Sequence, residues 1–168
     1  MELLIPGLIL VALMVYASTR IKRSAAAAFE AETIETDDFV IQKPDGFLNV
    51  IGGGERYAFE AYSKGFGGRD ENIRLATARL TVRPGASVEQ AFAAIEDDIA
   101  SDISEVIGER HYRVIESKRD ENDIEFRVFH KLAEKEGDLY DLEMTVFNEV
   151  PDEFLNKAEA MLTSFELK

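Results

Sequence analysis

The sequence contains no cysteine, only two histidines, and far fewer basic than acidic residues. The absence of cysteine excludes disulfide bonds, metal sites built on thiolates, and cysteine nucleophiles. The chain has 19 lysine and arginine residues against 33 aspartate and glutamate residues, and its formal net charge is −14. Because such a charge repels a phosphate backbone, no nucleic acid is expected as a partner.

The residue patterns of common catalytic and phosphate-binding sites are also missing. The glycines at 52–54 lack the Gly-Lys-Ser/Thr ending of a phosphate-binding loop, and those at 65–68 lack the helix that should follow. No serine lies in the Gly-x-Ser-x-Gly context of an activated nucleophile. We therefore expect no enzyme and no cofactor, and a hydrolase or transferase is the least supported hypothesis.

One uncharged apolar run lies at the start of the chain. Residues 3–17 carry no charge. A helix of about 17 residues reaches roughly 25 Å, which is just enough to cross a hydrocarbon core. The run predicts a transmembrane anchor with a basic stop over residues 1–23, and a lipid bilayer as its partner. The anchor residues are Leu3, Leu4, Ile5, Leu8, Ile9, Leu10, Leu13 and Tyr16.

The charges that flank this run predict its orientation. Arg20, Lys22 and Arg23 follow the apolar residues, and basic clusters favour the cytoplasmic side of a membrane. The expected location is therefore a bacterial inner membrane, crossed once, with the remaining residues in the cytoplasm. Two alternatives stay open: a domain on the periplasmic side, and a signal peptide cleaved near residues 25–28. Signal peptides carry their basic residues before the apolar run, which argues against cleavage.

The rest of the chain is predicted to form a short linker, 24–31, and one α+β domain, 32–168. Residues 24–168 are long enough to bury a core of their own. Alternating apolar residues predict strands at 29–35, 38–43, 56–64, 73–83, 112–118, 123–133 and 138–150. This alternation is typical of an antiparallel sheet with one covered face.

Two helices are predicted to pack on this sheet. Ser87 and Gln90 form a capping box, and Gly108 is expected to end the first helix. Its apolar stripe is Val88, Phe92, Ile95, Ile99, Ile103 and Val106, with Glu89, Glu96, Asp97 and Asp102 on the solvated side. The second helix begins at Pro151, and its inward-facing residues are Phe154, Leu155, Ala158, Met161, Leu162 and Phe165.

Short motifs in this arrangement resemble those of the PsbP-like family. Residues 44–47, Pro-Asp-Gly-Phe, are similar to the Pro-(Asp/Glu)-Gly-Trp opening of these domains, with phenylalanine in place of the usual tryptophan. Residues 137–142 and the ending Leu-Thr-Ser-Phe at 162–165 resemble the family's closing strand and final helix. The resemblance covers residues 32–168 and implies an αβα sandwich. The family includes photosystem-associated and bacterial envelope proteins, generally binding or assembly proteins, and many face the lumen or periplasm.

These observations favour a non-enzymatic, single-span accessory or assembly protein whose acidic domain docks onto a larger membrane protein complex. The alternative is a membrane-tethered domain that binds a small ligand or a metal. His130 is the weak ligand candidate, because it falls among the apolar positions of a predicted strand. A metal site would require His130 to meet His111 or a carboxylate such as Glu116 or Asp141.

Overall fold

A computed structural model of the chain describes residues 14, 16, 26–50, 56–63, 74–121 and 123–168. Of the predicted anchor residues, only Tyr16 is among them; it is helical and its side chain is exposed. The others, and the basic residues Arg20, Lys22 and Arg23, lie outside the described residues. Within the described part of the chain, no helix is both long and apolar enough to cross a membrane. The anchor and its orientation therefore stay predictions.

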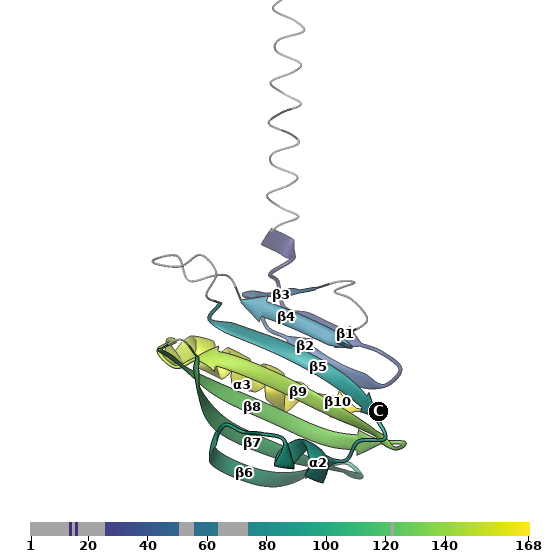
Figure 1. Ribbon diagram of the computed structural model, residues 1–168. Helices are drawn as coiled ribbons and strands as arrows, with labels where there is room; N and C mark the ends of the chain where they lie inside the picture. Colours follow the sequence, from purple (N-terminus) through teal and green to yellow (C-terminus); the bar gives the residue numbers. More distant parts are fainter. Residues whose placement is uncertain (1–13, 15, 17–25, 51–55, 64–73, 122) are drawn as a thin grey trace, which may run out of the picture.

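A seven-stranded antiparallel sheet forms the centre of the domain, in the order β3-β4-β5-β9-β8-β7-β6 (Figure 1). Its strands are β3 (Phe47–Asn49), β4 (Phe59–Ser63), β5 (Ala76–Pro84), β6 (Asp98–Ile107), β7 (Arg110–Glu121), β8 (Ile124–Lys135) and β9 (Asp138–Phe147). Between β8 and β9 the chain turns through Glu136 and Gly137, whose φ angles are 57° and 88°. Two consecutive positive φ angles are typical of the tight hairpin turns that match the twist of antiparallel strands.

A second layer covers one face of this sheet. It consists of α3 (Asp152–Ser164) and a three-stranded sheet of β1 (Glu32–Glu35), β2 (Phe39–Lys43) and β10 (Glu166–Leu167). Phe39, Met161 and Phe165 from this layer share one apolar cluster with Leu80 and Leu142 of the large sheet. The predicted inward face of the last helix is confirmed, because Ala158, Met161, Leu162 and Phe165 are buried while Phe154 and Leu155 are partly buried.

The prediction of the first helix is correct up to Ala93 and wrong beyond it. Helix α2 spans only Val88–Ala93, and the following strand β6 takes up the second half of the predicted stripe. The capping box is confirmed: the Gln90 amide donates to Ser87 Oγ at 3.2 Å, and the Ser87 amide donates to Gln90 Oε1 at 3.1 Å.

The apolar residues of the lost helical half lie on an edge strand. Ile99, Ile103 and Val106 are 45%, 59% and 60% exposed, so they do not form the predicted buried stripe. Isoleucine and valine favour extended backbone, and β6 pairs along its length with β7. These two effects favour a strand more strongly than the three- and four-residue spacing of the apolar residues favours a helix. Gly108, at a φ of 61°, turns the chain between these two strands instead of ending a helix.

Both faces of the large sheet carry apolar clusters. The alternation of apolar residues predicted only one covered face. Ala91 of α2 packs with Ile115, Leu132 and Leu139 on the face opposite α3. Leu132 lies opposite Asp141 and Leu142 lies opposite Lys131, one position along each strand, so Leu132 faces α2 while Leu142 faces α3. His130 shares the face of Leu132 and therefore lies on the α2 side of the sheet.

Candidate functional site

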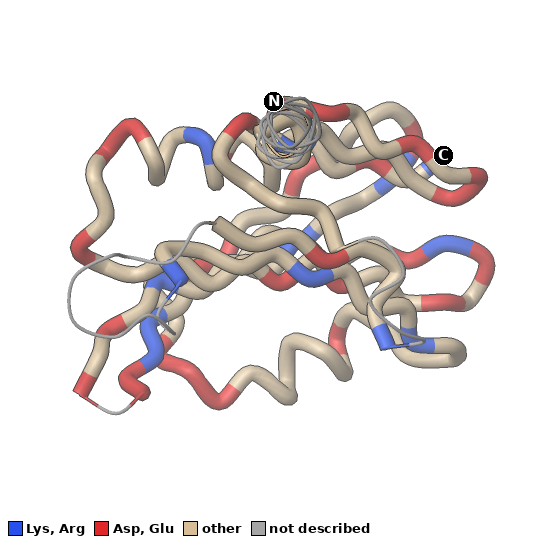
Figure 2. The backbone as a smooth tube through the Cα atoms, turned by 90° about the horizontal axis from the view of Figure 1, so that it is seen from above, with Lys and Arg blue, Asp and Glu red and all other residues tan. Residues whose placement is uncertain are grey.

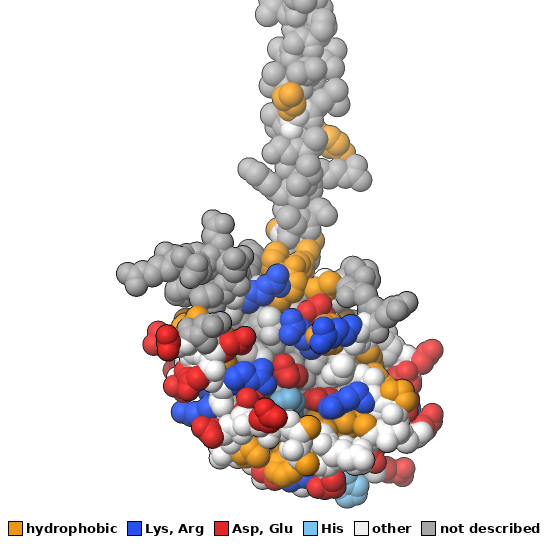
Figure 3. All heavy atoms as spheres, viewed as in Figure 1, with side chains coloured by type: hydrophobic (Ala, Val, Ile, Leu, Met, Phe, Trp, Pro, Cys, Tyr) orange, Lys and Arg blue, Asp and Glu red, His pale blue; other side chains and the backbone are white. Residues whose placement is uncertain are grey.

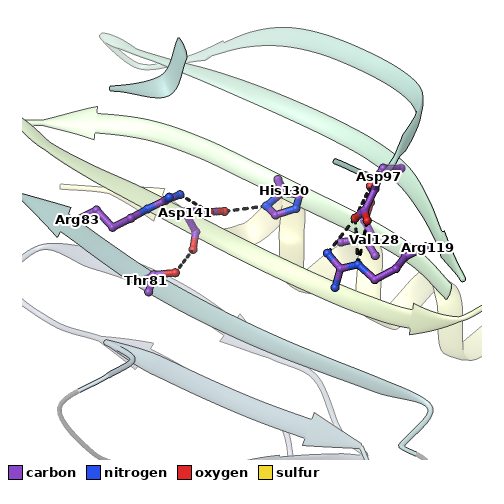
Figure 4. A network of polar contacts seen from close by, with 8 residues as sticks. Thr81, Arg83, Asp97, Arg119, Val128, His130 and Asp141 are labelled. Carbon is purple, nitrogen blue, oxygen red and sulfur yellow. Dashed lines mark hydrogen bonds and ion pairs between the residues drawn. The ribbon is translucent and has the colours of Figure 1, made fainter. Parts of the chain in front are cut away.

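A row of polar side chains crosses the α2 side of the large sheet (Figure 4). Arg83 comes from β5, Asp141 from β9 and His130 from β8. Arg83 Nη2 donates to Asp141 Oδ2 at 2.7 Å, and His130 Nδ1 lies 2.9 Å from Asp141 Oδ1. Asp141 thus uses both carboxylate oxygens to connect a guanidinium group with an imidazole ring.

Strand register brings these three residues together. Asp141 lies opposite Leu132 on β8 and opposite Thr81 on β5. His130 and Arg83 are each two positions from those partners, so both are diagonal neighbours of Asp141 on the same face, within reach of long side chains. The contacts therefore follow from the pairing of three strands that are distant in sequence.

Burial and hydrogen bonding orient the His130 ring. His130 and Asp141 are only 6% and 8% exposed. A carboxylate that accepts a hydrogen bond from Arg83 only accepts, so the imidazole donates through Nδ1. Within the described residues His130 has this one hydrogen-bond partner, and the residue lines a surface pocket. The Nε2 atom is therefore the ring nitrogen left for a ligand.

A second ion pair closes the other side of this pocket. Asp97, between α2 and β6, accepts from Arg119 of β7, with 2.8 Å from Nη2 to Oδ2 and 3.0 Å from Nε to Oδ1. The hydrogen bond to Asp97 raises the pKa of Arg119 above its ordinary value. Ser117 Oγ also lies 3.4 Å from Asp97 Oδ2. These contacts hold the segment that follows α2 against the sheet.

The pocket has a volume of about 380 Å³ and an excess of negative charge. Its lining carries two arginines and four carboxylates, so it favours a cation over an anion. Figure 3 shows the same side of the molecule, where acidic, basic and apolar side chains are intermixed. The lining residues are Arg83, Ala91, Ala94, Ile95, Glu96, Asp97, Arg119, His130, Asp141 and Glu143.

The described lining of this pocket lacks a hydroxyl or amine nucleophile. The described lining residues include no serine, threonine, tyrosine or lysine that His130 could activate as a nucleophile. The nearby Ser117 Oγ lies 3.4 Å from both Asp97 Oδ2 and the Val128 carbonyl oxygen, and its one proton can be donated to either acceptor. Among the described residues, no group of three or more histidines and carboxylates is placed to hold a metal ion.

The structure tests where the candidate histidines lie. His130 meets Asp141, which is one of the partners considered from the sequence, but it meets neither His111 nor Glu116. His111 is exposed beside the edge strand, opposite Val106. Glu116 pairs with Arg127 on the other face of the sheet, with 2.8 Å between Arg127 Nη2 and Glu116 Oε1.

Sequence reasoning missed the basic half of the site. Arg83 and Arg119 were not singled out, and Asp97 was assigned to the solvated side of a helix. The period-two alternation of β5 and β7 could have placed each arginine on a sheet face. No local signal reports which carboxylate meets which arginine, because that depends on the order of strands in the sheet.

Comparison with known proteins supports the fold. Neither protein-family models nor curated protein sequences match this chain. Among solved structures, the solution structure of cyanobacterial PsbP (CyanoP) from Synechocystis sp. PCC 6803 matches with a TM-score of 0.55 and 11% sequence identity. The match covers 83% of this chain and 92% of CyanoP. The fold is PsbP-like.

A second solved structure has a similar arrangement. A crystal structure from Bacteroides thetaiotaomicron VPI-5482 matches with a TM-score of 0.51 and 13% identity over 77% of this chain. The matched part is 45% of that protein, so this chain spans less than half of its length. At these identities the PsbP-like fold is shown, in agreement with the motifs at 44–47 and 162–165, while residue roles do not transfer.

Proposed function

We propose that this chain is a single-span, membrane-anchored accessory or assembly protein, without enzymatic activity, whose PsbP-like domain docks onto a larger membrane protein complex. The location proposed is the cytoplasmic face of a bacterial inner membrane, with the periplasmic face as the alternative.

One combination of features carries this proposal: an uncharged run at residues 3–17 precedes a PsbP-like domain. A domain fixed to a membrane meets other membrane proteins in two dimensions, where contact is favoured by high effective concentration. The His130 pocket adds a binding surface and, in the described residues, no nucleophile beside the imidazole. Binding rather than catalysis is the activity that these features support.

The proposal is tested by purifying the tagged full-length chain from its own membrane in mild detergent. Stoichiometric membrane partners are expected to copurify. The matched control replaces residues 3–19 by an unrelated apolar span that keeps the same flanking charges. A small residue pair, Pro6-Gly7, lies in the natural span, and helix packing in membranes favours small residues, so the control is expected to retain fewer partners. Recovery of the wild-type chain without any partner would contradict the proposal.

A second function, capture of a small cation, is favoured by the His130 pocket alone. Its test uses the two histidines as reporters, because His111 is exposed and lies away from the pocket. In ¹H–¹³C spectra of the full chain in detergent, titration with a simple diamine should shift the His130 ring signals and leave those of His111 in place. Equal shifts of both rings would indicate nonspecific binding and remove this function.

A further inference from the structure

Strand β6 leaves one whole side of the large sheet unpaired. It is the last strand in the order of the sheet, and no strand within the described residues pairs with its outer edge. Natural edge strands are usually protected by short length, charged side chains (lysine above all), proline or a bulge. β6 is ten residues long and contains no lysine or proline; its protection is limited to three acidic residues and a bulge at Ala100. This edge therefore has the hydrogen-bonding groups that another strand needs.

The side chains of this edge are unusual for an exposed position. Ile103 and Val106 are 59% and 60% exposed, although the chain as a whole is strongly charged. Two of the acidic residues of β6 are paired with basic residues of the same molecule. Asp102 Oδ2 lies 2.8 Å from Arg113 Nη2, whose guanidinium group also pairs with Glu89 at 3.1 Å, and Glu105 Oε1 lies 2.9 Å from Lys131 Nζ. The middle of β6 therefore combines an exposed isoleucine with polar residues whose acidic side chains are in ion pairs.

We propose that β6 pairs antiparallel with β6 of a second copy of this chain, about a two-fold axis at Ile103. This register places the two Ile103 side chains opposite each other, and Asp102 opposite Ser104 of the second copy. In the same register Ser101 lies opposite Glu105 of the second copy, and Val106 lies opposite the bulge at Ala100 of the second copy. No like charges face each other directly, and the two seven-stranded sheets become one continuous sheet.

The ion pairs of β6 explain why a second copy fits despite the acidity of the chain. Acidic positions are spread around the whole molecule (Figure 2), and each copy carries a formal charge of −14. Repulsion between copies is thus a long-range effect, which salt screens within about 10 Å at 0.1 M ionic strength. Association through β6 should therefore strengthen as the salt concentration rises. Pairing with a basic strand from another protein would weaken under the same change.

The experiment exploits the absence of cysteine from the chain. Two single-cysteine variants of the full-length protein, Ile103→Cys and Val106→Cys, are oxidised mildly in detergent. The two positions are almost equally exposed, so random collisions affect both alike. Opposed residues on antiparallel strands lie about 4.5–5.5 Å apart between Cα atoms, a distance that a disulfide spans. In the proposed register the two copies of position 106 are about 20 Å apart along the strand, too far for a bond.

Ile103→Cys is expected to form at least about tenfold more disulfide-linked dimer than Val106→Cys, because only the first pair meets the geometric requirement. This excess should grow between 0.05 M and 0.5 M salt. Equal cross-linking of the two variants, or none for Ile103→Cys, would overturn the proposal. A cross-link that weakens with added salt would also contradict it and would point to a basic partner strand. The outcome does not depend on whether the chain docks onto a membrane complex.

Discussion

Truncation of Phe165 should remove a large part of the stability of the domain. The Phe165 ring is fully buried and lies 6.2 Å from the Phe39 ring and 6.4 Å from the Tyr112 ring, measured between centroids. Tyr112 also accepts a hydrogen bond from the Leu167 amide at 2.8 Å. Phe165 therefore joins the end of α3 to β2 and to β7. Replacing a buried phenylalanine by alanine costs about 3–5 kcal/mol, from lost transfer energy and from the cavity that remains.

That cost is large compared with the total of about 5–15 kcal/mol typical of a domain. In urea, with a slope of about 2 kcal/mol per molar, the unfolding midpoint of Phe165→Ala should fall by about 2 M. Far-UV circular dichroism of the full chain in mild detergent measures this midpoint.

The matched control is Ile103→Ala, measured at a dilution where the chain is monomeric. Ile103 is 59% exposed, so its truncation should change the free energy of unfolding by less than about 0.5 kcal/mol. A loss below about 1 kcal/mol for Phe165→Ala, or similar losses for both variants, would refute the packing described for α3 and β6.

Three further outcomes are expected. Asp141→Asn should cost about 1–3 kcal/mol in urea unfolding, because it removes the negative charge and leaves one acceptor oxygen where Arg83 and His130 each use one. The partial exposure of Arg83 keeps the cost in this range, and an unchanged midpoint would contradict it. Arg113 lowers the pKa of Asp102 by hydrogen bonding, so its stabilising effect is present above the ordinary value of 3.8 and disappears as the pH falls through the lowered pKa. The difference in urea midpoint between wild type and Arg113→Gln should therefore shrink on acidification, and a constant difference would exclude this coupling. A tag placed after Lys168 should survive protease treatment of intact spheroplasts, whereas its digestion beside a protected cytoplasmic control would reverse the predicted orientation.

Local patterns were sufficient to predict the last helix and most of the large sheet. Pro151 and the apolar spacing from Phe154 to Phe165 indicated α3, and the structure buries its predicted inward residues. The strands predicted at 123–133 and 138–150 correspond to β8 and β9, because strict alternation and a glycine-containing turn define such a hairpin.

The helical stripe from Val88 to Val106 failed for a physical reason. A spacing of three and four residues also fits a short helix followed by a strand, provided that the later residues need not be buried. Only the pairing of β6 with β7 separates the two possibilities, and this pairing depends on residues after the Gly108 turn. If β6 pairs with a second copy, the apolar residues in the pattern are explained by association rather than by the core.

The candidate site was only partly predictable for the same reason. The position of His130 among apolar residues indicated a half-buried side chain, and the structure buries it further, to 6% exposure. Its contact with Asp141 was one possibility among several. Arg83, Asp97 and Arg119 come together only because β5, β9, β8 and β7 are neighbours in the sheet. Strand order is a property of the whole chain, so no single motif contains it.

The native size of the untagged protein in a mild-detergent extract of its own membrane tests the central claim most directly. Two-dimensional native and denaturing electrophoresis measures this size together with the proteins that migrate alongside. The proposed accessory function predicts migration far above the 18.8 kDa chain and above its dimer, with other membrane proteins present in fixed ratio. Migration as a monomer or a homodimer alone would contradict the claim that this protein acts by docking onto a membrane complex.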